Sequence, residues 1–243
     1  MPVIDFSPVD IAAILVFLAA WIGYGTLIGR LSGTGRTLSS AMDVQRRQWM
    51  RVMVRRDLRM IDTAIMSGLQ NGTAFFAATS LLAIGGAFAL LNATDRIFGV
   101  LGDLSLQSTV PRGMFELKAI GLILIFGYAF FQFGWSYRLF NYASILLGAT
   151  PTAVHAGEAA ASEAADRAAL FTIIAGRHFN HGLRAFFFAV GYLGWFLNGW
   201  VLMLATALIF SIQLYRQFMS PSARAVIAAA KALQAAEAGQ PAP

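Results

Sequence analysis

A run of 32 residues, from Thr63 to Thr94, contains no Asp, Glu, Lys or Arg. Six arginines lie just before this run, between Arg46 and Arg59. A helix needs about 20 mainly apolar residues to cross the ~30 Å hydrocarbon core of a bilayer. The abrupt change from dense positive charge to no charge therefore predicts that the chain enters a membrane here, from the cytoplasmic face.

The rest of the composition agrees with a membrane protein. Only 12% of the 243 residues are charged, whereas soluble domains carry about 25%. Four apolar segments are long enough to span, and they cover residues 11–29, 63–94, 119–137 and 185–215. We predict an all-α helical integral membrane protein with four transmembrane helices and amphipathic cytoplasmic extensions. Residues 1–219 form this single domain, and 220–243 form an Ala-rich C-terminal tail.

The distribution of Lys and Arg predicts an orientation. The loops 30–62 and 138–184 contain eight and four of these cations, and the rest of the chain contains six. Cytoplasmic loops carry the excess of Lys and Arg, so both loops are expected in the cytoplasm. With four spans, the chain is a multi-pass protein of the cell inner (cytoplasmic) membrane with its N and C termini on the non-cytoplasmic side.

The arginine-rich segment shows a helical pattern from about residue 40 to the second span. Four of its arginines form a single i, i+4 row, and like charges at that spacing repel each other. The row therefore needs anions, and there are two possible sources. Lipid phosphates at the cytoplasmic surface are one, and the acids Glu158, Glu163 and Asp166 of the loop 138–184 are the other. The expected contacts with anionic headgroups or a partner are Arg46, Arg47, Arg51, Arg55, Arg56 and Arg59. Nucleic acid is not an expected partner, because this positive charge lies beside a membrane span.

Two acidic residues near the membrane boundary need partners. Asp57 falls within the apolar sector of the predicted helix, and Asp62 directly precedes the second span. An ionised carboxylate in an apolar environment must be paired or protonated. Arg138 and Arg184 are the cytoplasmic candidates for the partners in such buried ion pairs. The two acids are then either structural contacts or proton-active groups.

The second span begins with four polar residues on one helical face: Thr63, Ser67, Gln70 and Asn71. Gly68 and Gly72 make a small-xxx-small pair beside them. Small and polar residues let membrane helices approach closely and form hydrogen bonds. This face is therefore either a packing surface or the lining of a pore.

Metal and catalytic motifs are not evident in the sequence. The chain has no cysteine and three histidines, of which His178 and His181 are spaced to share a helix face. A metal site would need further ligands, so these two residues are weak candidates and we expect no cofactor. The chain lacks the sequence patterns of serine hydrolases, zinc proteases and phosphate-binding loops. No spacing of residues argues for catalysis.

Several short blocks resemble one family of membrane proteins. They are Arg46-Arg47-x-Trp49-Met50, Arg56-Asp57-x-Arg59-x-x-Asp62, Phe75-Phe76-Ala77-x-Thr79 and Phe179-Asn180-x-Gly182-Leu183-Arg184-Ala185-Phe186. In this order and spacing the chain resembles domain-of-unknown-function family 599. The resemblance implies a polytopic bacterial membrane protein and implies no activity.

Three functions are compatible with these features. The first is a non-catalytic scaffold or accessory subunit of a membrane complex. The second is a homo-oligomeric channel or transporter with the second span lining the pathway. The third is a membrane enzyme or cofactor-binding protein that uses His178 and His181. In each case we expect contact with membrane lipids and either a homo-oligomer or a larger complex.

Overall fold

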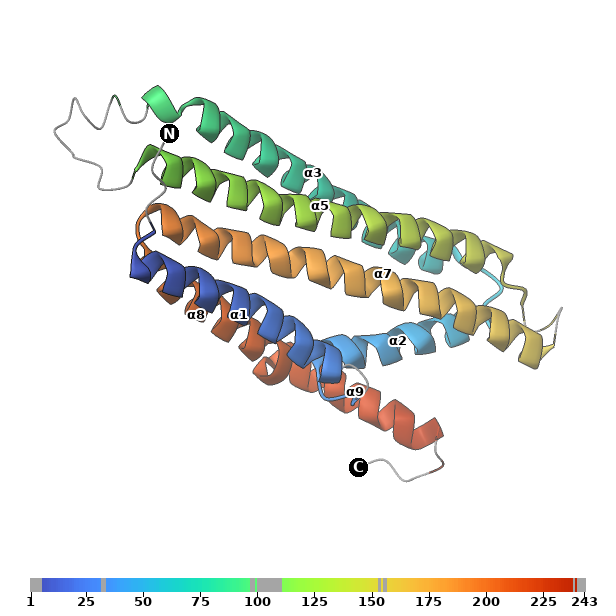
Figure 1. Cartoon of the computed structure of the whole chain (residues 1–243). Coiled ribbons are helices and arrows are strands. Elements are labelled where there is room, and N and C mark those ends of the chain that lie inside the picture. The colour runs from blue at the N-terminus through green and yellow to red at the C-terminus, as the bar shows by residue number, and fades with distance from the viewer. Residues whose placement is uncertain are drawn as a thin grey trace. The chain divides into compact units, whose positions relative to one another are not determined.

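The computed structural model describes residues 6–31, 34–96, 99, 111–152, 154, 157–237 and 239. Within these ranges the chain is all-α and has no strand, as predicted. The helices are α1 Pro8–Leu31, α2 Leu38–Met53, α3 Met60–Asn92, α5 Arg112–Ala149, α7 Glu158–Tyr192, α8 Gly199–Leu214 and α9 Pro221–Glu237 (Figure 1). A 3₁₀ turn, Leu193–Phe196, precedes α8, and a π-helical turn, Tyr215–Met219, follows it.

Four helical segments are long and apolar enough to cross a membrane. They are Pro8–Leu31, Met60–Asn92, Arg112–Ala149 and Gly199–Glu237. The first and third contain the predicted spans 11–29 and 119–137 and extend beyond them at both ends. The second begins three residues before the predicted span 63–94 and ends two residues before its end. The additional turns bring charged residues such as Arg112 onto the same continuous helices as the apolar segments.

The fourth predicted span, residues 185–215, is not one helix. The structure ends α7 at Tyr192 and begins α8 at Gly199. The side chain of Asn198 accepts a hydrogen bond from the Val201 amide at 2.9 Å, which is the pattern of a helix N-cap. A Cβ at Gly194 would lie 3.0 Å from Val201 Cγ1 and 3.1 Å from the Val201 carbonyl oxygen, so a larger residue would force this close approach to open slightly. A hydropathy window averages over such a turn because its residues are largely apolar.

The described residues form two compact units. Unit 1 comprises those within Met1–Gly23, Phe76–Phe131 and His181–Phe210, and unit 2 those within Tyr24–Phe75, Gln132–Asn180 and Ser211–Pro243. The core of unit 1 is aromatic. Phe17 packs edge-to-face on Phe188 and Tyr192, with ring centroids 5.7 and 5.4 Å apart. Tyr192 lies directly on α5 because Gly121 has no side chain there.

Unit 2 is built on small side chains of α7. Ala161, Ala165, Ala168 and Ala169 are all buried in a core that includes methionines of α2. Alanine at successive turns lets neighbouring helices approach closely. The hydroxyl of Ser136 on α5 donates to the carbonyl of Ala175 at 2.8 Å, so this packing also includes direct hydrogen bonding between helices.

The C-terminal segment also belongs to unit 2, where α9 packs against α2. Gln217 donates to Ser39 Oγ at 2.8 Å, and Arg51 pairs with Glu237. The predicted topology placed the C terminus across the membrane from the arginine-rich loop. The side of the membrane on which each terminus lies stays a prediction.

Candidate functional site

The arginine-rich segment is not one continuous helix. The helix α2 starts with a capping box formed by Thr37 and Ser40 and ends at Met53. Residues 54–59 form a non-helical connection before α3 begins at Met60. A continuous helix would stack Arg51, Arg55 and Arg59 as a repulsive row. The break instead lets these arginines reach separate partners.

Asp62 is the central anion of this segment. It is fully buried, and its Oδ1 accepts hydrogen bonds from Trp49 Nε1 at 2.7 Å and Arg56 Nη1 at 2.6 Å. It also lies in the first turn of α3, where the helix dipole favours a negative charge. Its Oδ2 atom is buried without a hydrogen-bond partner among the described residues. Asp62 thus ties α2 and the connecting segment to the start of α3.

Arg59 binds the C-terminal end of α5. Its guanidinium donates to the carbonyls of Leu147, Thr150 and Pro151 at 3.1, 2.5 and 3.1 Å. The last carbonyls of a helix lack partners within the helix, and a cation at that end is stabilised by the dipole. Arg59 therefore holds the connecting segment against α5 and completes the hydrogen bonding of that helix end.

Arg46 also points inward. It pairs with Asp43 at 3.1 Å, and Asp43 in turn accepts two hydrogen bonds from Arg177. Burial lowers the pKa of Arg46, and the neighbouring Asp43 opposes this effect. A Cβ at Gly176 would lie 2.6 Å from the Arg46 guanidinium. The absence of a side chain at Gly176 is thus what makes room for the buried cation.

The other three arginines of the predicted lipid-contact set are nearer the surface. Arg55 pairs with Glu158, and both side chains are about three-quarters exposed. Arg51 pairs with Glu237 and, at 3.6 Å, with Asp166. Arg47 is exposed. The set therefore divides: Arg46, Arg56 and Arg59 make internal contacts, while Arg47, Arg51 and Arg55 can reach lipid or a partner.

Two of the predicted buried ion-pair residues lie at the surface instead. Asp57 is exposed, because α2 ends before it and the helical wheel that placed it among apolar residues does not apply. Arg138 is exposed too, and its guanidinium donates to the hydroxyl of Tyr142 at 2.7 Å. Arg184 is buried in unit 1. Of the two acids, only Asp62 occupies a buried position.

The histidines make ordinary side-chain contacts. His178 Nδ1 lies 2.7 Å from Gln132 Oε1, and its ring packs edge-on to Trp135. His181 is exposed. Nowhere in the described ranges do three His, Cys, Asp or Glu side chains gather closely enough to hold a metal ion. His155, the third histidine, lies outside the described residues.

The polar residues predicted to share one face of α3 also divide into an inward-pointing and an exposed group. Gln70 turns inward and donates to Asn141 Oδ1 at 2.8 Å and to Ser144 Oγ at 3.0 Å on α5. Thr63, Ser67 and Asn71 are exposed on the outer side of unit 2. Gln70 is therefore a packing residue, whereas the described residues leave the other three exposed.

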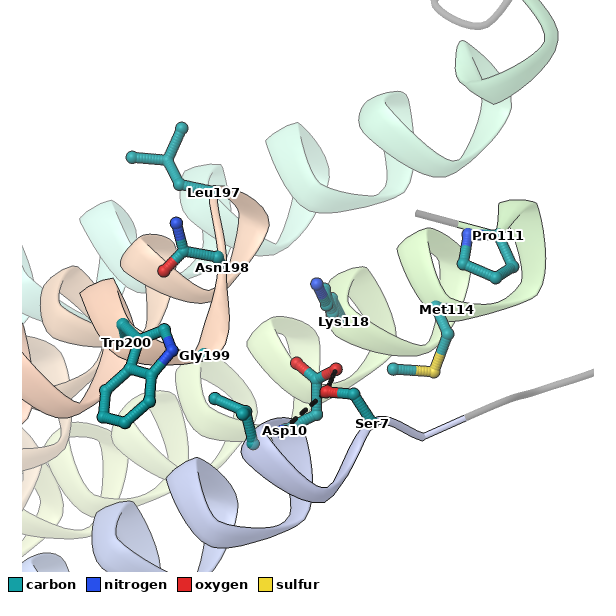
Figure 2. A pocket seen from close by; sticks show the side chains of 10 residues that line it. Ser7, Asp10, Pro111, Met114, Lys118, Leu197, Asn198, Gly199 and Trp200 are labelled. Carbon is teal, nitrogen blue, oxygen red and sulfur yellow. Dashed lines mark hydrogen bonds between the residues drawn. The ribbon is translucent and has the colours of Figure 1, made fainter. Parts of the chain in front are cut away.

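Unit 1 contains a polar cavity of about 400 Å³ that the sequence did not reveal (Figure 2). It lies at the start of α1, the start of α5 and the turn between α7 and α8. Its lining residues are Ser7, Val9, Asp10, Pro111, Met114, Lys118, Leu197, Asn198, Gly199 and Trp200. The side chains of an acid and a base, Asp10 and Lys118, both line it.

Trp195 organises the charged groups of this cavity. Its indole Nε1 donates to Asp10 Oδ1 at 2.7 Å, while its carbonyl accepts from Lys118 Nζ at 2.8 Å. The ammonium also lies 5.1 Å from the centre of the indole ring, within the range of a cation–π interaction. Ser7 Oγ donates to Asp10 Oδ2 at 2.7 Å. Only 2% of the surface of Lys118 is exposed, and these contacts hold its ammonium in a fixed position.

One sequence signal could have indicated Lys118. It lies seven residues after Pro111 and immediately before the predicted span starting at residue 119. A lysine this close to a span suggests a functional group or an interfacial anchor. Asp10 and Trp195 could not have been grouped with it, because they lie more than 75 residues away on either side.

These features define the class of the protein: an all-α integral membrane protein with four apolar candidate spans and no assigned chemistry. A family model described as "Protein of unknown function, DUF599" matches residues 12–222. The chain belongs to this family. No curated protein and no solved structure matches it.

Proposed function

We propose that this chain is a non-catalytic membrane protein that acts as a scaffold or accessory subunit and assembles with a second copy of itself through α3. The exposed face of α3 in unit 2 carries this proposal. Ala64, Ser67, Gly68, Asn71 and Phe75 are all exposed and recur at the three- and four-residue spacing of one helix face. Of the four candidate spans, α3 is the least covered by the chain itself, with 11% of its most apolar window buried.

Asn71 is the residue that favours a protein over lipid at this face. Within the part of the chain that the structure describes, its amide makes only a long hydrogen bond, 3.5 Å, to Ser67 Oγ, and hydrocarbon offers no partner for it. An amide both donates and accepts, so two copies of Asn71 can pair across a two-fold axis. Gly68, one turn away, lets the two backbones approach closely, as at other membrane helix interfaces.

A cysteine scan tests this interface directly, because the chain contains no cysteine. We expect Asn71→Cys to form a disulfide-linked dimer in native membranes under mild oxidation. The control Leu204→Cys, on the exposed face of α8, is expected to remain monomeric. Dimers at position 204 with none at 71 would contradict the α3 interface.

Native mass spectrometry in mild detergent measures whether a variant of this interface still forms the dimer. Asn71→Leu is expected to shift the protein to monomer, because the paired amide is lost. Asn92→Leu, the same change at the exposed end of α3, is expected to leave the dimer intact. A mass that carries a different protein in place of the second copy would retain the accessory role and identify the partner.

The second candidate, a homo-oligomeric channel, rests on the same exposed residues. Thr63, Ser67 and Asn71 would line a shared pathway if several copies gathered around this face of α3. Such a pore requires a ring of several copies. An assembly larger than a dimer, together with ion flux in proteoliposomes that Asn71→Leu abolishes, would favour the channel over the scaffold.

We further propose that α2 and α9 lie in the cytoplasm and the first turn of α1 on the opposite side. Since α1 crosses between Pro8 and Leu31, its start and α2 lie on different sides, and α9 contacts α2. Opposite termini require an odd number of crossings, so α7 crosses in addition to the four apolar spans. This arrangement puts fourteen of the eighteen Lys and Arg on the cytoplasmic side and Arg184 within the α7 crossing, a stronger bias than the four-span topology gives. There, Arg47 and Arg55 can contact anionic headgroups.

Single cysteines test this topology as well. We expect Asp95→Cys, after α3, to react with a membrane-impermeant maleimide in intact spheroplasts. Ala236→Cys, on α9, is expected to react only after lysis. Labelling of both positions in intact spheroplasts would restore the four-crossing topology with both termini outside.

A further inference from the structure

We propose that unit 1 binds one phospholipid with a phosphoethanolamine-type headgroup, whose phosphate and ammonium meet Lys118 and Asp10 and whose acyl chain lies along α1 and α5. The inference goes beyond the assembly proposed above and does not depend on it. It rests on the polar cavity of Figure 2 together with an apolar groove in the same unit.

The cavity has opposite charges in fixed positions. Lys118 has three N–H donors, and the structure assigns one of them to the carbonyl of Trp195. Among the described residues no carboxylate lies within 4.0 Å of Lys118, although Asp10 is close enough to interact electrostatically. Asp10 is thus a counter-charge at a distance, and a buried ammonium gains further from a negative charge in direct contact. A phosphate beside Lys118 supplies that charge, and an ammonium on the same molecule matches Asp10.

An apolar groove lies along the same two helices, α1 and α5. It has a volume of about 640 Å³ and is lined on α1 by Ile14, Leu18 and Ile22 and on α5 by Leu117, Ile120, Leu124 and Tyr128. Ile14 is one helical turn beyond Asp10, and Leu117 adjoins Lys118. The groove therefore continues along both helices from the polar cavity toward their centres.

Trp195 connects the two features. Its backbone carbonyl and indole nitrogen bind Lys118 and Asp10, while its side chain also lines the groove. From Leu117 to Tyr128 the groove follows α5 for about 16 Å at 1.5 Å per residue. That is about half of the ~30 Å hydrocarbon thickness, so it suits an acyl chain in one leaflet with its headgroup at the helix ends.

The two charges also define which headgroups fit. Phosphoethanolamine has a phosphate and a primary ammonium that donates hydrogen bonds. Phosphocholine has a quaternary ammonium with no such donor, and phosphoglycerol has no cation. A soluble phosphoethanolamine shares the charged chemistry but cannot occupy the groove. We therefore expect the ethanolamine lipid to bind best of the four.

Native mass spectrometry of the whole chain, released from nanodiscs of mixed lipid composition, tests the site. We expect one retained ethanolamine phospholipid per chain, with at least tenfold preference over the choline and glycerol lipids of equal chain length. Free phosphoethanolamine is expected not to compete at the same concentration. Equal retention of all three lipids would overturn the proposal, and effective competition by the free headgroup would indicate a soluble-ligand site instead.

Variants separate the headgroup from the groove. Lys118→Met is expected to reduce retention at least tenfold, whereas Lys231→Met, on the exposed surface of α9, is expected to have no effect. Should the Lys118 variant fail to fold, Leu124→Trp provides a second measurement, because Leu124 is exposed and lines the groove. We expect it to block retention, while Leu208→Trp on α8 leaves retention unchanged. Unchanged retention in Leu124→Trp would overturn the acyl-chain assignment.

Discussion

Replacing Asp62 with asparagine is expected to destabilise the protein by about 3 kcal/mol. The side chain keeps its shape, but the amide removes the negative charge that pairs with Arg56 and that the first turn of α3 favours. Breaking a buried ion pair costs about 3–5 kcal/mol. We expect the lower end of this range because the Arg56 side chain is 35% exposed. The temperature at which half of the protein stops eluting as a monodisperse species in detergent should fall accordingly.

The matched control for Asp62 is Asp57, five residues earlier. Asp57→Asn makes the same chemical change at an exposed position, and surface substitutions usually change stability by no more than about 0.5 kcal/mol. Equal losses for the two variants would contradict the assignment of Asp62 as the central anion of unit 2. A double variant, Asp62→Asn with Arg56→Gln, is expected to be less destabilised than the sum of the two single changes.

Replacing Arg59 with alanine is expected to destabilise the protein by about 3 kcal/mol. Three carbonyls at the end of α5 lose their donor at once, and hydrogen bonds that involve a charged group contribute about 1.5–3 kcal/mol each without being additive. Hydrogen exchange should rise at the amides of the last turn of α5, near Leu147, more than elsewhere in unit 2. Thermal unfolding in detergent measures the loss of stability of the whole protein.

Arg55→Ala is the control for Arg59. It removes the same side chain four residues earlier, where the pair with Glu158 is largely exposed, and such pairs contribute about 0–1 kcal/mol. Arg59→Lys separates charge from geometry, because a lysine keeps the positive charge but cannot donate in the fork that reaches three carbonyls. If Arg59→Lys were as stable as the parent protein, charge alone would explain the role of this residue.

The helical membrane class and three of the four apolar helices could be predicted from the sequence. These features depend on local composition: a segment such as 63–94 with no charge can satisfy its backbone in lipid only as a helix. The family relationship could also be predicted, because the blocks that carry the resemblance are short and linear. The residues Asp62, Arg56 and Arg59 were flagged for the same reason, since clustered charge beside a span requires partners.

The particular partners could not be predicted, because they come from distant parts of the chain. Asp57 and Asp62 look alike in sequence, and only the end of α2 at Met53 exposes one while the other is buried. The same holds for Arg59, whose acceptors are about 90 residues away. A helical wheel assumes that the helix continues, so it fails wherever the chain turns.

The sequence by itself determined that this chain is a helical membrane protein with its positive charge concentrated beside the second span. The tertiary structure decided which arginines serve the interior and that residues 193–198 turn the chain. It also decided that Asp10, Lys118 and Trp195 meet around one cavity. The two groups of features differ in how far apart in the sequence the interacting residues lie. The hydrophobic effect and backbone hydrogen bonding in lipid act within one segment. Ion pairs and cavities such as these arise only when distant segments pack together.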